Sequence, residues 1–246
     1  MCAVDSPASM IPTKSKGKIL GLALVLAVPV SALAENVILL HGLARTDRSM
    51  HKLEQALVEQ GYCVENVSYE STRHDIETLA EMAIRPALLA CPGGQVTHFV
   101  THSLGGILVR QYLQKHRIDN LGRVVMLGPP NKGSEVVDKL GDFPGFHFIN
   151  GDAGLQLGTG ATSVPNRLGP AEFDLGVIAG TRSINLFLSS MIPGPDDGKV
   201  SVENTRLEGM RDHLEMEVTH TFMMGNSEVI EQVIYYLREG RFKRDD

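Results

Sequence analysis

Val96–Gly106 reads VTHFVTHSLGG, and this stretch decides the fold. A run of residues that favour β-strands comes first, then Ser103 among small residues, and then a segment with helix-forming character. This order is typical of a nucleophile elbow, a sharp strand-to-helix turn that holds a serine hydroxyl above a sheet. Gly105 stands two residues after Ser103, whereas Thr101 stands two residues before it, where glycine is usual. A serine at this position can also simply cap the following helix, so the interpretation depends on the rest of the chain.

Further motifs occur along the chain in the order that such a site requires. Asn36–His41 reads NVILLH, an apolar strand that ends in a His-Gly turn. Pro195–Val200 reads PDDGKV and contains two neighbouring aspartates, and Val218–Thr221 reads VTHT. The resulting order of serine, aspartate and histidine is that of the α/β-hydrolase arrangement and differs from the other serine-hydrolase orders.

Together these motifs resemble those of small α/β-hydrolases of the bacterial lipase/esterase type. The HG turn, the HSLGG elbow and the GPPNKGS sequence of Gly128–Ser134 carry the resemblance, which spans nearly all of Asn36–Leu237. It implies an α/β-hydrolase fold and the hydrolysis of carboxylic esters through an acyl-enzyme. Acyl transfer or amide hydrolysis by the same residues, and a binding module without catalysis, remain open because one fold hosts many functions.

Strand and helix patterns alternate along the chain and predict one α/β domain with a doubly wound, mostly parallel sheet of about six strands. The predicted strands span residues 36–40, 62–68, 96–101, 123–127, 175–179 and 214–218. The predicted helices span residues 49–60, 76–90, 105–116 and 227–238. Pro86 is expected to kink or end the second helix. Residues 131–173 are rich in Gly, Pro and Asn and interrupt this rhythm; they are interpreted either as a lid-like insertion at the site or as a surface insertion.

An unassisted serine hydroxyl is a weak nucleophile, so it needs a base and an acid that orients the base. With Ser103 as the candidate nucleophile, position in the chain selects the base among nine histidines. His220 follows the last predicted strand and precedes the final helix, which is where the fold places its base. His102 is expected to point away from the serine, and His41 to shape the turn after the first strand.

The candidate acid is one of the two neighbouring aspartates. Asp197 directly precedes the Gly-Lys-Val segment and so matches the triad aspartate of the lipases that the chain resembles, while Asp196 stays the alternative. An oxyanion hole consists of N–H groups aimed at the developing negative charge. The fold assigns these groups to Leu104, after the nucleophile, and to Leu43, after the His-Gly pair. The loop at Leu43 reads HGLART and lacks the HGGG form of many esterases.

The composition limits the classes of partner. The chain has 246 residues, of which 43% are hydrophobic and 21% charged, with a formal net charge of −6. This apolar content fills a core, and the acidic balance argues against a nucleic-acid partner. The sequence contains no metal-ligand spacing, phosphate loop or dinucleotide fingerprint, so no metal and no cofactor are expected. The expected partner is a small-molecule or lipid ester, while peripheral membrane contact and the oligomeric state remain open.

The N-terminal residues predict export. Three lysines precede an apolar run over residues 19–30, and an Ala-Leu-Ala site ends at Ala34. A basic region, a short apolar region and an A-x-A site are typical of a secretory signal, here residues 1–34, with Met10 as an alternative start. The run is shorter than the roughly 18 residues that a spanning helix needs. An inner-membrane anchor over residues 19–33 stays the alternative to a periplasmic or secreted domain at residues 35–246.

Export affects the expected state of two cysteines. Cys63 and Cys91 both lie in the predicted mature domain, and an even number in an oxidising compartment favours a disulfide. Cys63 begins a predicted strand and Cys91 ends the helix before the next one, so both lie at the edge where the strands of a parallel sheet begin. A Cys63–Cys91 disulfide is therefore expected, and two buried free thiols are the alternative.

Overall fold

The computed structural model describes residues 34–244. The expected signal or anchor lies outside these residues, except for Ala34, and stays a prediction. Within residues 34–244, no helix is long and apolar enough to cross a membrane. The described chain forms a six-stranded sheet in the order β2-β1-β3-β4-β5-β6, and every pairing between neighbours is parallel.

The strands are β1 (Asn36–Leu40), β2 (Cys63–Val67), β3 (Thr97–His102), β4 (Leu121–Leu127), β5 (Leu175–Gly180) and β6 (Asp212–Met216). The helices that cover the sheet are α1 (His51–Glu59), α2 (Ile76–Ala90), α3 (Leu104–Leu113) and α9 (Ser227–Glu239). The other helices are α4 (Glu135–Leu140), α5 (Pro144–Leu155), α6 (Val164–Arg167), α7 (Leu186–Ser189) and α8 (Val202–Thr205). Two 3₁₀ turns, η1 (Asp47–Met50) and η2 (Met223–Gly225), adjoin α1 and α9.

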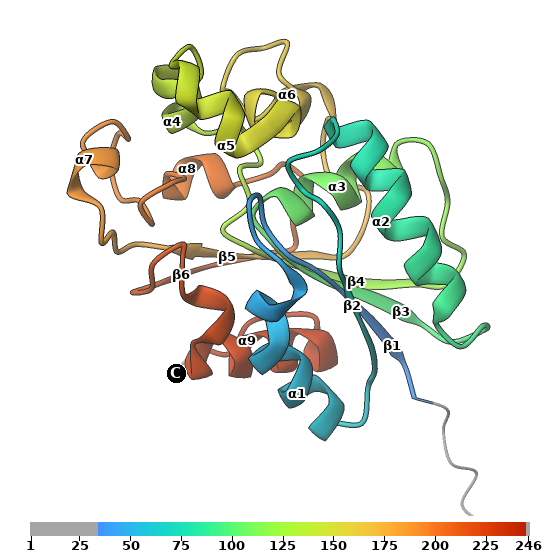
Figure 1. Ribbon diagram of the computed structural model, residues 1–246. Helices are drawn as coiled ribbons and strands as arrows, with labels where there is room; N and C mark the ends of the chain where they lie inside the picture. Colours follow the sequence, from blue (N-terminus) through green and yellow to red (C-terminus); the bar gives the residue numbers. More distant parts are fainter. Residues whose placement is uncertain (1–33, 245–246) are drawn as a thin grey trace, which may run out of the picture. The chain divides into compact units, whose positions relative to one another are not determined.

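Alternation of side chains along the strands produces a core on each face of the sheet. In β1, Ile38 and Leu40 pack with α2 and α3, whereas Val37 and Leu39 pack with α1 and α9. Figure 1 shows these two pairs of helices on opposite faces. All five residues of β1 are buried, as expected for a strand covered on both sides.

The strand order determines where a site forms. After β1 the chain passes outward to β2 and then returns to the other side of β1 to form β3. Loops that leave β1 and β3 therefore diverge from a shared carboxyl edge, which is where open α/β sheets bind their ligands. The residues that follow β1 are His41 and Gly42, and the residue that follows β3 is Ser103.

The structure confirms the doubly wound sheet, and most of the observed strands and helices differ from the predicted ones by one to three residues at their ends. Strand β6 begins and ends two residues earlier than predicted. Helix α2 spans Ile76–Ala90 as predicted and continues through Pro86, so of the two alternatives at Pro86, a kink or an early end, the early end is wrong. Residues 131–173 are not devoid of regular structure, because they contain α4, α5 and α6. These helices are short, and non-helical backbone at Gly151 interrupts α5, so they lack the sustained apolar spacing by which longer helices are recognised.

The expected Cys63–Cys91 disulfide is not formed in the structure. Both residues are free thiols of intermediate burial. Burial, and after it the nearby Cys63 and Glu65, raise the pKa of the Cys91 thiol to about 11. The sequence places both cysteines at one edge of the sheet, but a disulfide also requires a narrow range of Cβ separation and direction that strand order alone does not fix.

A buried arginine on α3 ties residues 131–173 to the sheet domain. The Arg110 guanidinium donates to the backbone oxygen of Asn131 at 3.0 Å, to that of Pro165 at 2.9 Å and to that of Gly169 at 2.9 Å. Its side chain is only 4% exposed, and burial lowers its pKa to about 10. One side chain thus holds both the beginning and the end of the segment.

Replacing this arginine tests its anchoring role. We expect Arg110→Met to lower the free energy of unfolding by about 2–4 kcal/mol, because two buried carbonyl groups and one partly buried carbonyl group lose a charged donor. Limited proteolysis of the variant is expected to cut within residues 131–173 before it cuts elsewhere. Arg117→Met is the control, because Arg117 is 90% exposed and pairs only with the exposed Asp119. Equal stability and equal proteolysis of the two variants would contradict the anchoring role.

Candidate active site

The strand-to-helix turn at Ser103 has the backbone conformation of an elbow. Ser103 has φ 52° and ψ −117°, a region that is strained for any residue with a Cβ. Its N–H donates to Leu127 at 2.9 Å, and its carbonyl accepts from Gly106 at 3.0 Å. The Ser103 side chain makes no capping hydrogen bond with the first turn of α3. The alternative of a simple helix cap therefore does not describe this serine.

Close approach of the chain around the elbow explains its small residues. A Cβ on Gly105 would lie 2.6 Å from the Leu40 carbonyl oxygen. A Cβ on Gly42 would lie 2.6 Å from Nδ1 of His102 and 3.2 Å from Cβ of Ser103. The loop after β1 thus packs directly against the elbow, and only glycine fits at both contacts.

A buried hydrogen bond joins the predicted acid and base. Nδ1 of His220 lies 2.6 Å from Oδ2 of Asp197, and the two side chains are 5% and 0% exposed. The other carboxylate oxygen, Oδ1, accepts from the backbone N–H groups of Lys199 at 3.0 Å and Val200 at 2.9 Å. A second bond joins the N–H of His220 to the Asp197 carbonyl at 3.0 Å. The carboxylate and the imidazole are therefore fixed relative to each other.

The neighbouring aspartate makes different contacts. Oδ1 of Asp196 accepts from the N–H of Gly198 at 2.7 Å, and Oδ2 accepts from the hydroxyl of Ser189 at 2.5 Å. These bonds shape the turn and fasten it to the end of α7, as Asp commonly does in turns. Of the two aspartates in the motif, Asp197 is the one that bonds to His220.

The two N–H groups of the predicted oxyanion hole belong to the loop after β1 and to the start of α3. Within the described part of the chain, the N–H groups of Leu43 and Leu104 donate no hydrogen bond. Leu104 is the first residue of α3, and the N–H groups at the start of a helix have no partner within it. Leu43 follows Gly42, whose loop is fastened one residue later by the N–H of Ala44, which donates to Ser71 at 3.0 Å.

Two further histidines support the site. Nε2 of His102 lies 3.0 Å from the His220 carbonyl, and the two rings lie 4.7 Å apart. Burial is the main cause, and the charge of His220 the second, of a pKa for His102 well below its usual range. The ring is therefore neutral and donates through Nε2. His41 stacks on Tyr69 at 4.0 Å, and the Tyr69 hydroxyl donates to the His41 carbonyl. His102 thus contacts the predicted base, and His41 shapes its loop as expected.

The predicted residues gather around one cavity. Its volume is about 270 Å³, on the scale of a site for a small molecule. Ser103, Leu43 and His220 line it. Its apolar wall is formed mainly by α4, α5 and their surroundings, from Val136, Val137, Leu140, Phe146, Ile149 and Leu157. The segment that interrupted the sequence pattern therefore supplies most of the wall.

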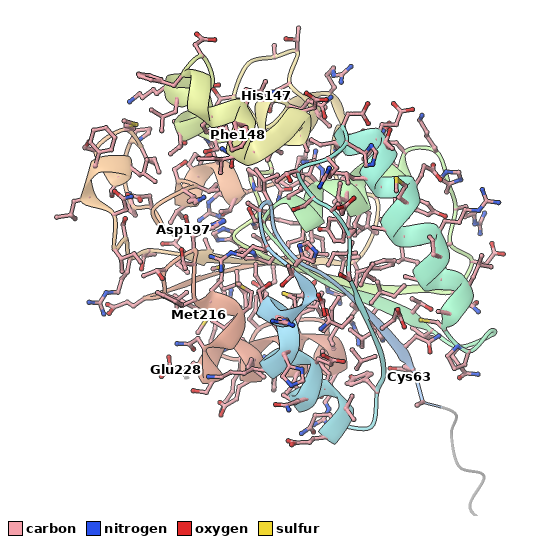
Figure 2. The ribbon with its side chains drawn as sticks, in the orientation of Figure 1. Cys63, His147, Phe148, Asp197, Met216 and Glu228 are labelled. Atoms are coloured by element: carbon pink, nitrogen blue, oxygen red, sulfur yellow. The ribbon has the colours of Figure 1, made fainter. Side chains whose placement is uncertain are left out.

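The aromatic residues of this segment divide into two groups. Phe146 lines the cavity. Phe143 and Phe148 are not among the residues that line the cavity, and their exposure, 61% and 91%, excludes them from the core. Figure 2 labels Phe148 and His147 on α5, with Asp197 nearer the sheet. Three phenylalanines of one segment thus differ in role, and only Phe146 belongs to the wall.

Sequence reasoning missed two residues of the cavity, Arg45 and Lys199. Each stands two residues from a predicted site residue: Arg45 follows Leu43, and Lys199 follows Asp197. Their closeness in the chain to Leu43 and Asp197 was the sequence feature that could have indicated that Arg45 and Lys199 lie at the site. Among residues 34–244, no three His, Cys, Asp or Glu side chains gather into a group that could hold a metal ion.

Three features define the α/β-hydrolase fold. The parallel sheet reverses its direction of growth at β1, a strained serine follows β3, and a buried Asp-His pair lies in the loops after β5 and β6. Solved structures agree with this assignment. The mature lipase BlEst2 of Bacillus licheniformis aligns with a TM-score of 0.65 at 20% identity, over 83% of this chain and 92% of that chain. Phospholipase PlaB of Legionella pneumophila aligns with a TM-score of 0.66 at 18% identity, over 85% of this chain and 60% of that chain.

A third similar structure is the esterase EaEST of Exiguobacterium antarcticum, with a TM-score of 0.56 at 17% identity, over 84% of this chain and 92% of that chain. No protein-family model matches the sequence, and a search of curated proteins finds no relative. The likeness therefore establishes the α/β-hydrolase fold, whereas the activity has to be argued from the site.

The strain at the elbow leads to a prediction about stability. We expect Ser103→Gly to be more stable than Ser103→Ala by about 1–2 kcal/mol, because glycine adopts this backbone conformation without a steric penalty. The measurement is chemical denaturation of the two variants under identical conditions. In ordinary helices and strands the order is the reverse, with alanine more stable by about 0.5–1 kcal/mol. An Ala variant as stable as the Gly variant would show that the backbone at residue 103 is unstrained.

Proposed function

We propose that this protein hydrolyses carboxylic esters through an acyl-enzyme formed on Ser103. The observation that carries the proposal is the buried 2.6 Å bond between His220 and Asp197, beside a cavity that His220 and Ser103 both line. A carboxylate bonded to Nδ1 of a histidine fixes the tautomer and leaves Nε2 free to accept a proton. The His220–Asp197 pair differs in this burial from the exposed ion pairs on the protein surface.

In the first half of the reaction, Nε2 of His220 accepts the proton from Oγ of Ser103 as Oγ attacks the ester carbonyl carbon. The carbonyl oxygen becomes an oxyanion, and the N–H groups of Leu43 and Leu104 donate to it. Asp197 stabilises the imidazolium that forms. The bond from the carbonyl carbon to the alcohol oxygen then breaks, and His220 returns the proton to the departing alcohol.

In the second half, a water molecule replaces the alcohol. His220 takes a proton from this water as its oxygen attacks the acyl carbon, and the same two N–H groups stabilise the second oxyanion. Collapse of the intermediate breaks the bond to Ser103, and the proton returns to Oγ. The products are a carboxylic acid and the free enzyme.

The apolar wall supports a substrate with a substantial acyl chain. Six apolar residues of the segment around α4 and α5 line the cavity, so an acyl chain can be removed from water there. The names of the similar structures, a lipase, a phospholipase and an esterase, support ester hydrolysis at this coarse level. Whether the 131–173 segment moves as a lid stays a prediction.

We also propose that the reaction takes place outside the cytoplasm. The support is the sequence pattern of a secretory signal that ends at Ala34. Ala34 and Glu35 are exposed and precede β1, so cleavage between them would remove nothing from the sheet.

Substitution of the proposed catalytic residues tests the reaction. We expect Ser103→Ala to abolish covalent labelling by a fluorophosphonate probe, and peptide mapping of the wild-type protein to locate the probe on Ser103. We expect Ser103→Ala, His220→Ala and Asp197→Asn each to lower kcat for a nitrophenyl ester by a factor of about 10³–10⁴ or more, because such residues act as a unit.

Asp196→Asn is the matched control for the acid, because it makes the same chemical change one residue away. Its carboxylate bonds to Gly198 and Ser189 and not to His220, so we expect a loss at least about a hundredfold smaller than that of Asp197→Asn. A silent Asp197→Asn beside a damaging Asp196→Asn would reverse the assignment of the acid. A probe attached to any other residue would refute Ser103 as the nucleophile.

Acyl-chain preference tests the wall. We expect kcat/KM for nitrophenyl octanoate to exceed that for the acetate by about tenfold or more, since each buried methylene contributes up to about 0.8 kcal/mol. Phe146→Ala is expected to reduce this gain, whereas Phe148→Ala leaves it unchanged because Phe148 is 91% exposed. A profile that peaks at acetate, or faster cleavage of matched amides than of esters, would contradict the proposal.

A further inference from the structure

The cavity has a cationic side as well as an apolar wall. Arg45, from the loop after β1, and Lys199, from the turn that carries Asp197, line it together with Ser103 and His220. Among the described residues that line the cavity, there is no Asp or Glu. Two positive charges thus lie beside the elbow in a protein whose formal net charge is −6.

Neither cation is neutralised by a neighbouring carboxylate. Within residues 34–244, neither Arg45 nor Lys199 forms an ion pair. Asp197 lies close enough to favour the charged form of Lys199, but both of its carboxylate oxygens already accept hydrogen bonds from His220 and the backbone. The two side chains therefore remain available to a ligand.

The two cations also repel each other. Desolvation beside the cavity lowers the pKa of Lys199, and the positive charge of Arg45 lowers it further. Arg45 lowers the pKa of the buried His102 as well. Like charges held near one another disfavour the free protein, and an anion bound beside them would remove that repulsion.

We propose that Arg45 and Lys199 bind an anionic group on the alcohol portion of the substrate, so that the enzyme prefers amphipathic esters whose alcohol carries a carboxylate or phosphate. This inference rests on the proposed ester hydrolysis. The acyl chain occupies the apolar wall of α4 and α5, where an unpaired charge would be costly to bury. The anion therefore belongs to the other side of the scissile bond, where the cations lie.

Three octanoyl-length esters test the inference: 4-nitrophenyl octanoate, 3-carboxy-4-nitrophenyl octanoate and mono-4-nitrophenyl suberate. The first is neutral, the second carries its charge on the alcohol, and the third carries it at the end of the acyl chain. Each kcat/KM is divided by the rate constant of the same ester with hydroxide, which removes differences in leaving-group reactivity. We expect the second ester to exceed the first at least about fivefold at low ionic strength, with a smaller ratio in 0.5 M salt.

Variants locate the effect. We expect Arg45→Gln to bring the ratio of anionic-alcohol ester to neutral ester close to one, and Arg45→Glu to bring it below one. Lys199→Gln is expected to lower the ratio in the same direction. Arg117→Gln is the matched control, because it removes one positive charge from an exposed site outside the cavity and leaves the ratio at its wild-type value.

The outcomes separate this inference from the proposed function. Hydrolysis of all three esters with a ratio near one, or a ratio that Arg45→Gln does not change, would overturn the cationic subsite while leaving ester hydrolysis intact. Preference for the suberate would place the anion on the acyl side and overturn the orientation. Failure to hydrolyse any of the esters would contradict the proposed function and this inference with it.

Discussion

The strained backbone of Ser103 is the constraint on which the rest of the site depends. A left-handed φ between β3 and α3 brings the chain from strand to helix within a single residue. It sets the side chain of Ser103 at the carboxyl edge of the sheet and leaves the N–H of Leu104 without a partner in its helix. Bonds to Leu127 and Gly106, together with the close packing of Gly42 and Gly105, hold this conformation.

The remaining parts of the site follow from the position of β1. Because β1 and β3 are neighbours, the loop after β1 lies against the elbow, where Gly42 packs on His102 and Ser103. Strands β5 and β6 lie two and three positions beyond β3 in the sheet, and the loops after them carry Asp197 and His220. The site is therefore assembled from the ends of β1, β3, β5 and β6, each rigid within the sheet, while residues 131–173 cover it.

Much of this arrangement could be predicted from the sequence, because the deciding residues have local roles. Apolar runs predicted the strands, a small-residue frame predicted the sharp turn at Ser103, and chain order made His220 the candidate base. The choice of Asp197 over Asp196 rested on the resemblance alone, and the structure distinguishes them by their hydrogen bonds. His102 was expected to point away from the serine, and its contact with His220 depends on how β3 and the last loop pack, which no local pattern encodes.

Other features could not be predicted because they depend on long-range packing. The helices of residues 131–173 are held by Arg110 and by contacts with distant loops, and their own sequences have little helical periodicity. The free state of Cys63 and Cys91 depends on side-chain direction, which strand order leaves open. Arg45 and Lys199 meet at one cavity although 154 positions separate them in the chain, because two loops end at the same edge.

A crystal structure of the protein inactivated by ethyl 4-nitrophenyl octylphosphonate, which loses 4-nitrophenolate and keeps its ethoxy group, would test the proposed reaction most directly. The account predicts phosphorus bonded to Oγ of Ser103, a phosphonyl oxygen within about 3 Å of the N–H groups of Leu43 and Leu104, and the octyl chain along Phe146 and Leu157. His220 would lie beside the alkoxy-side oxygen while keeping its bond to Asp197. An adduct on another residue, or a phosphonyl oxygen directed away from both N–H groups, would contradict it.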